Sequence, residues 1–136
     1  MIPGATKTLS KGCDVLAPDG SEVRILLSLA GGSMAHFLLE PGQVSRAVSH
    51  RTVDEIWYIL CGTGEMWRST GGEQHTVALS AGTCPTVPVG TTFQFRCSGN
   101  NRLAAVAVTM APWPGDDEAE MVKAIWDPAS SPISHQ

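Results

Sequence analysis

HRTVDEIWYILCG at residues 50–62, together with GTCPTVPVGTTF at residues 82–93, decides the fold of this chain. The first stretch is rich in β-branched and aromatic residues, which predicts a strand at residues 55–60. In the second, Pro88 fixes the backbone angle φ on entry to a turn, and Gly90 permits the tight bend into the next strand. Strands are therefore expected on both sides of this turn.

Similar short runs rich in Val, Ile, Leu, Thr and aromatic residues recur along the chain, separated by Gly, Pro, Asn and Asp. The predicted strands cover residues 21–29, 34–40, 44–49, 55–60, 64–69, 74–79, 84–87, 92–97 and 103–109. One helix is expected at residues 116–125, because its acidic first turn suits the helix dipole. Many short strands and one late helix fit an all-β jelly roll, although strand count alone does not separate it from an immunoglobulin-like sandwich.

Composition limits the classes of partner. The chain has 136 residues, a net charge of −4 and no cluster of Lys and Arg, which argues against nucleic acid or an anionic membrane and favours a small-molecule ligand. No stretch resembles a secretory signal or a membrane span, so a cytoplasmic location is expected. The expected organisation is an N-terminal arm at 1–20, a barrel at 21–112, and a C-terminal helix with a frayed tail at 113–136.

The two stretches resemble the paired motifs of the cupin family. The family's first motif has two histidines separated by one residue, then a glutamate and a glycine; the second has a glycine, a Pro-x-Gly turn and a histidine. The matching residues are His50, Glu55 and Gly62 in the first motif and Gly82, Pro88 and Gly90 in the second. The resemblance implies the cupin double-stranded β-helix, a jelly-roll barrel, here with a short C-terminal helix.

The metal ligands of the family are only partly present. Thr52 stands in place of the second histidine and Phe93 in place of the histidine of the second motif. The resemblance therefore leaves His50 and Glu55 as metal ligands, and two ligands are too few for tight binding of a transition metal. No cofactor is predicted, while a divalent transition metal stays open if Cys97 or His36 completes the site.

Side chains alternate across a strand, so each motif residue predicts its neighbours in the barrel interior. Arg46 and Thr52 would lie on the same strand face as His50. Trp57 would share the face of Glu55, and Phe95 and Cys97 would share that of Phe93. The residues predicted to bind the ligand are thus Arg46, Thr52, Trp57, Phe93, Phe95 and Cys97. Arg46 could bind a substrate carboxylate or phenolate, or it could only neutralise a nearby glutamate.

His50 and Glu55 are the candidate catalytic residues. Without metal, the carboxylate would orient the imidazole and raise its pKa, and the imidazole would move a proton on a substrate held against Trp57 and Phe93. This chemistry suits an isomerase, epimerase, cyclase or dehydratase. The alternatives are a non-catalytic cupin that senses or carries a small molecule, and a metal-dependent dioxygenase or isomerase with a non-standard ligand set.

Three further expectations concern packing. A homodimer is expected, with the outward residues Ile56, Tyr58 and Leu60 of the first motif as its contact. The stiff segment at residues 111–115 would close one barrel mouth or lie in the dimer contact. Trp126 would pack the late helix onto the sheet.

Overall fold

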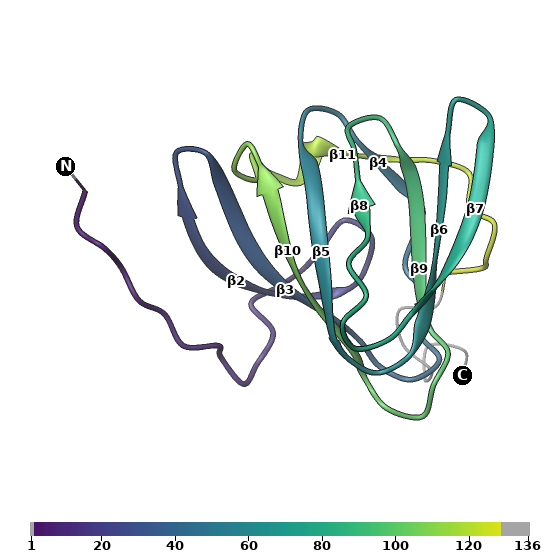
Figure 1. The fold of residues 1–136 in the computed structure, drawn as a ribbon, viewed down its shortest axis with the longest axis horizontal. Helices are drawn as coiled ribbons and strands as arrows, with labels where there is room; N and C mark the ends of the chain where they lie inside the picture. The colour runs from purple at the N-terminus through teal and green to yellow at the C-terminus, as the bar shows by residue number, and fades with distance from the viewer. Residues whose placement is uncertain (1, 129–136) are drawn as a thin grey trace.

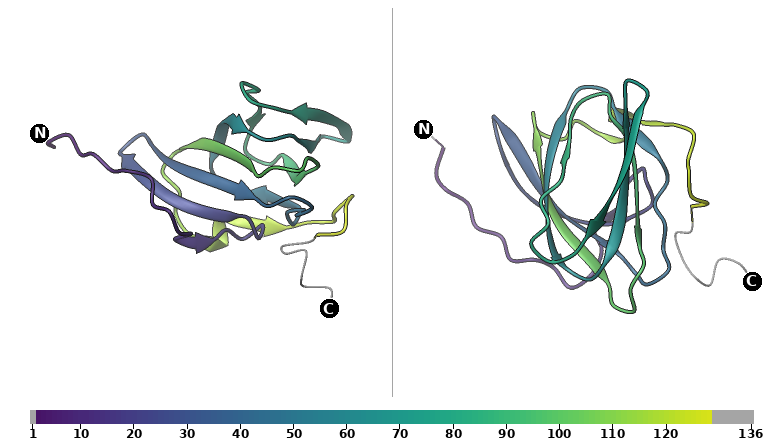
Figure 2. Two further views of the ribbon diagram at one scale, coloured as in Figure 1. Left: turned by 90° about the horizontal axis from the view of Figure 1, so that it is seen from below. Right: turned by 45° about the vertical axis from the view of Figure 1, so that its right-hand side comes forward.

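The computed structural model describes residues 2–128, and the frayed tail expected at 129–136 lies outside them. Two antiparallel sheets face each other (Figures 1 and 2). The first contains, in spatial order, β1 (Val15–Leu16), β2 (Glu22–Leu29), β3 (Gly32–Leu39), β10 (Leu103–Met110), β5 (Asp54–Cys61) and β8 (Thr86–Val87). The second contains β11 (Ala119–Met121), β4 (Val48–His50), β9 (Thr92–Cys97), β6 (Gly64–Thr70) and β7 (Glu73–Leu79). The jelly-roll prediction is confirmed.

Strand β5 shows why the chain forms a two-sided sheet. Glu55, Trp57 and Ile59 are buried, whereas Ile56 and Tyr58 between them are exposed. This alternation is the period of 2 that a strand imposes on its side chains. The register places Glu55 of β5 opposite Thr109 of β10 and opposite Val87 of β8, so Glu55 is fixed by a strand on each side.

The core lies between the two sheets. Its buried residues come mainly from the inner faces of β5, β9 and β10: Leu39, Val48, Trp57, Ile59, Met66, Leu79, Val87, Phe93, Phe95, Cys97, Leu103, Ala105 and Ala107. Burial of these apolar side chains is the main stabilising contribution to the fold.

The turn expected at Pro88 and Gly90 is present. Gly90 has φ +80°, a conformation that favours glycine, and the backbone N–H of Thr91 donates to the Pro88 carbonyl at 3.0 Å. Gly62, after β5, has φ +85°, and a Cβ atom there would lie 2.1 Å from the Arg102 carbonyl oxygen. Both motif glycines are therefore required by the backbone.

The prediction of a helix at residues 116–125 is wrong. Asp116–Glu118 forms a single 3₁₀ turn, and the chain then continues as β11, which pairs with β4. The acidic residues suit the start of either kind of helix, but the ladder with β4 supplies backbone hydrogen bonds to the residues that follow. Trp126 does contact the sheet, with the Arg96 guanidinium 4.0 Å from its ring centroid, but it does so from an irregular segment.

The first residues of the chain extend from the barrel in Figure 1. Residues 2–16 are exposed, and Arg24 of β2 holds part of this arm by donating from Nε to the Ser10 carbonyl at 2.8 Å and from Nη2 to the Lys11 carbonyl at 2.7 Å. Within residues 2–128, no helix has the length and apolar character needed to cross a membrane.

Candidate ligand site

A cavity of about 360 Å³ lies at one end of the barrel interior. On β5 it is lined by Glu55 and Trp57 but not by Ile59, and on β9 by Phe93 but not by Phe95. The cavity therefore occupies the end at which both strands begin, while apolar side chains fill the other end. Its volume is within the range of small-ligand sites.

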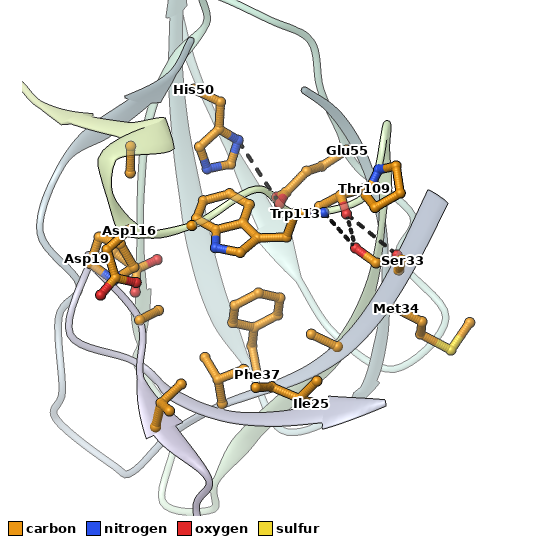
Figure 3. A pocket seen from close by; sticks show the side chains of 18 of the residues that line it. Asp19, Ile25, Ser33, Met34, Phe37, His50, Glu55, Thr109, Trp113 and Asp116 are labelled. Atoms are coloured by element: carbon orange, nitrogen blue, oxygen red, sulfur yellow. Dashed lines mark hydrogen bonds and ion pairs between the residues drawn. The ribbon is translucent and has the colours of Figure 1, made fainter. Parts of the chain in front are cut away.

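The walls come from both sheets and from two connecting segments (Figure 3). The strands contribute Val15, Val23, Ile25, Leu26, Leu27, Ser28, Ser33, Met34, Ala35, Phe37, Val48, His50, Glu55, Trp57, Phe93, Thr109 and Ala119. The segments before β2 and after β10 contribute Ala17, Pro18, Asp19, Pro112, Trp113, Gly115 and Asp116. Most of these side chains are apolar, and a few polar groups converge among them.

Glu55 is the most deeply buried carboxyl group of the cavity, with 2% of its surface exposed. Its Oε1 accepts a hydrogen bond from Trp57 Nε1 at 2.8 Å, a contact between neighbours on the same face of β5. Burial raises the pKa of Glu55 to about 7, although the Trp57 hydrogen bond lowers it; Asp19 and Glu118 raise it further. Glu55 can therefore both give up and accept a proton near neutral pH.

His50 lies beside Glu55 on the cavity wall and is 5% exposed. Its Nδ1 is 3.9 Å from Glu55 Oε2, too far for a hydrogen bond, and has no hydrogen-bond partner among the described residues. Burial lowers the pKa of His50 to about 4, against a smaller opposing effect of Glu118. The prediction that this pKa increases is wrong, because desolvation of the imidazolium outweighs the effect of the Glu118 carboxylate.

Aromatic rings enclose the two polar groups. Trp57 stacks on Phe37 with ring centroids 5.3 Å apart, and His50 meets Phe93 and Trp113 edge to face, each at 5.2 Å. The Trp113 backbone N–H donates to Ser33 Oγ at 2.9 Å, and Ser33 in turn hydrogen-bonds Thr109. The segment at 111–115 therefore lies at the barrel mouth, one of its two expected positions.

Two residues predicted to bind the ligand do not line the cavity. Arg46 is exposed and donates from Nη1 to the Pro18 carbonyl at 3.3 Å. Thr52 is also exposed, and its hydroxyl donates to Glu118 at 2.6 Å. Both placements were wrong because β4 covers only Val48–His50, so the alternation counted from His50 does not extend to either residue.

Phe95 and Cys97 are buried as predicted but belong to the filled end of the barrel. Cys97 Sγ lies 3.1 Å from the Asn101 carbonyl. Among the predicted ligand-binding residues, Trp57 and Phe93 reach the cavity.

Asp19 is a cavity residue that the sequence did not indicate. It is buried, and its Oδ1 accepts hydrogen bonds from the backbone N–H and hydroxyl of Ser21 at 2.9 and 2.6 Å. Burial raises its pKa, while the Ser21 bonds and the nearby charge of Arg46 lower it. The Asp-Gly pair at residues 19 and 20 has the composition of a turn, and no motif connects it with the barrel interior.

The donor set does not fit the family's metal site. Thr52 is bonded to Glu118 outside the cavity, and Phe93 occupies the position expected for a third histidine. His36 is buried away from the cavity wall, and burial and then Arg24 lower its pKa. Across residues 2–128, no three His, Cys, Asp or Glu side chains form a group that could hold a metal ion.

The fold and the hollow end of the barrel define a double-stranded β-helix of the kind found in cupins. A family model described as a cupin domain matches residues 35–109, more than half of the chain. The chain belongs to the cupin family. The comparison with curated proteins found no match.

Solved structures show the same fold. A deletion variant of oxalate decarboxylase from Bacillus subtilis superposes with a TM-score of 0.64 at 20% identity, over 70% of this chain and 27% of that chain. A conserved Klebsiella pneumoniae protein described as having a double-stranded β-helix domain gives 0.63 at 16% identity, over 76% of this chain and 85% of that chain. The chain thus spans about a quarter of the oxalate decarboxylase, and these identities support the fold alone.

Proposed function

We propose that this cupin binds a small organic molecule in the cavity and that Glu55 transfers a proton on it. The observation that carries the proposal is the position of Glu55. One carboxyl oxygen is fixed by Trp57, and the other has no hydrogen-bond donor among the described residues. A pKa of about 7 supports the assignment, because a general acid or base works best near the pH at which it titrates.

The proposed reaction is an isomerisation. The Glu55 carboxylate removes a proton from a carbon next to a carbonyl group, and the electron pair of the broken C–H bond stays on the substrate as an enolate. The substrate carries a carbon–carbon double bond next to that carbon, so the enolate is a dienolate, and the protonated carboxyl group returns the proton to its far carbon; no electrons enter or leave. His50, neutral at pH 7, would hydrogen-bond the substrate oxygen, since its Nδ1 has no hydrogen-bond partner within residues 2–128.

Binding without catalysis is the second candidate function. The mainly apolar walls favour it, because they suit ligand binding whether or not a reaction follows. In this case His50 and Glu55 would only orient the ligand. We do not propose a metal-dependent reaction, because residues 2–128 do not supply the ligand set of the family's metal site.

Proton exchange distinguishes the two candidates. We would incubate the protein with 4-phenylbutan-2-one, an uncharged ketone with exchangeable C–H bonds, in D₂O and follow loss of the C–H signals by proton NMR. We expect catalysed exchange by the wild-type protein and by Glu73→Gln, an exposed control on β7, and none by Glu55→Gln. Ligand-induced shifts without exchange would support the binding role, and unchanged exchange in Glu55→Gln would contradict our assignment.

A further inference from the structure

The ionisable acidic groups of the cavity wall are not balanced by cationic side chains from residues 2–128. Three carboxyl groups line it, from Asp19, Glu55 and Asp116, and among the described residues no Lys or Arg does. In Figure 3, Asp19 and Asp116 lie on one side of the cavity and Glu55 on the other. The nearby Arg46 points to the exterior and bonds to the Pro18 carbonyl. An anion in this cavity would therefore face carboxyl groups without a cationic side chain on the wall.

Asp19 is placed to hold a cation. Its Oδ1 is occupied by both donors of Ser21, whereas Oδ2 receives no hydrogen bond from the described residues. Among the described residues, the fully buried polar side-chain atoms without a partner do not include Asp19 Oδ2, so a ligand or water in the cavity can reach this oxygen. Two charged groups interact electrostatically with Asp19. The charge of Arg46 lowers the pKa of Asp19, and Asp19 raises the pKa of Glu55, but neither side chain donates a hydrogen bond to Oδ2.

The aromatic walls favour the same kind of ligand. Phe37, Trp57, Phe93 and Trp113 all contribute to the cavity. The face of an aromatic ring carries partial negative charge and attracts an organic cation, most strongly in the case of tryptophan. The apolar remainder of the wall would accommodate the hydrocarbon part of such a ligand.

We propose that the ligand of this cavity is a compact hydrophobic ammonium compound of the arylalkylamine class that also carries the carbonyl group needed for the proposed reaction, with the Asp19 carboxylate as the partner of its nitrogen. This inference rests on the proposed function and names its ligand class. It assigns two separate roles, since Asp19 anchors the cation and Glu55 remains free to move a proton. The carboxylate counterpart of the same compound is rejected, because like charges brought together in a desolvated site repel each other strongly.

The test uses three probes that share one skeleton and differ in charge. Calorimetric titration at neutral pH would compare 2-phenylethylamine, which is an ammonium ion there, with 2-phenylethanol and 3-phenylpropanoate. We expect the ammonium ion to bind at least about tenfold more tightly than the carboxylate and more tightly than the alcohol. Carboxylate affinity equal to or above that of the ammonium ion would overturn the inference and leave small-molecule binding standing.

Variants then locate the anchor. Asp19→Asn should weaken ammonium binding by about tenfold and change alcohol binding by less than about twofold, so alcohol binding reports an intact cavity. Asp117→Asn, an exposed control outside the cavity, should change neither. Unchanged ammonium affinity in Asp19→Asn would overturn the assignment of Asp19 as the partner of the ammonium group. Failure of all three probes to bind would contradict both this inference and the binding part of the proposed function.

Discussion

At the scale of single residues, the chemistry of the cavity depends on desolvation. Burial disfavours the charged form of each group, so the pKa of Glu55 increases while that of His50 decreases. The 3.9 Å separation of His50 Nδ1 and Glu55 Oε2 is too long for a hydrogen bond that would reverse these shifts. Near neutral pH, the pair is therefore a neutral imidazole beside a titrating carboxyl group, and Glu55 is the better proton carrier.

The pKa of Glu55 predicts how stability depends on pH. Its usual value of 4.5 rises to about 7 on folding, so its contribution to the free energy of unfolding is complete below pH 4.5 and is lost as the pH rises to about 7. We expect Glu55→Gln, which retains an acceptor for Trp57, to be more stable than wild type by about 2 to 3 kcal/mol at about pH 8. The two proteins should be similar at about pH 5.

Urea unfolding at both pH values measures this difference. Asp19 is present in both proteins, so the comparison isolates Glu55, and Glu73→Gln serves as the surface control. A stability difference that is the same at both pH values would show that Glu55 does not titrate in this range.

The sequence located part of the cavity and misplaced the rest for a physical reason. His50, Glu55, Trp57 and Phe93 lie on the wall, because motif spacing and strand alternation hold within β4, β5 and β9. Alternation fails outside a strand, which is why Arg46 was misplaced. Asp19 reaches the cavity through tertiary contacts of an irregular segment, and these have no local pattern in the sequence.

At the scale of elements, Glu118 connects the 3₁₀ turn to the β4–β5 connection. Its Oε2 accepts from the backbone N–H groups of Thr52 and Val53 at 2.6 and 3.0 Å, and its Oε1 accepts from the Thr52 hydroxyl at 2.6 Å. Burial alone would raise the pKa of Glu118, but these hydrogen bonds together lower it. The carboxylate therefore holds the loop between His50 and Glu55.

Two substitutions at Glu118 should separate hydrogen bonding from charge. Glu118→Ala leaves the Thr52 and Val53 N–H groups without their acceptor, and we expect it to lower the free energy of unfolding by about 2 to 4 kcal/mol. Glu118→Gln can accept both N–H bonds through its carbonyl and donate its amide to the Thr52 hydroxyl, so a loss of about 1 kcal/mol or less is expected. Urea unfolding of both variants measures the difference, and equal losses would contradict it.

The strand pattern itself was predicted well wherever a strand has enough residues to show alternation. The bounds of β2, β5, β6, β7, β9 and β10 agree with the predicted ranges to within about a residue at each end. Val15–Leu16 and Ala119–Met121 are too short for any period to be visible, and β11 exists because it pairs with β4. The acidic 116–118 segment resembled a helix start because nothing in its local sequence indicates this partner.

At the scale of the whole molecule, the two ends of the larger sheet differ on its outer face. Near β2 and β3, Arg24 and His36 are buried, and Arg24 is bonded to the N-terminal arm. On β5, Ile56, Tyr58 and Leu60 remain 43%, 50% and 43% exposed. Contiguous exposed apolar side chains on a strand are typical of an interaction surface, which agrees with the predicted homodimer.

The homodimer prediction is tested by placing a charge at the centre of this face. Tyr58→Glu would bury an unpaired carboxylate in the contact, and desolvation of that charge should separate the copies without affecting the fold, because Tyr58 is half exposed in the single chain. Light scattering coupled to size exclusion should give twice the 14.4 kDa chain mass for wild type and for Thr76→Glu on β7, and the single-chain mass for Tyr58→Glu. A mass unchanged by Tyr58→Glu would exclude this face as the contact, and single-chain mass for wild type would exclude the dimer.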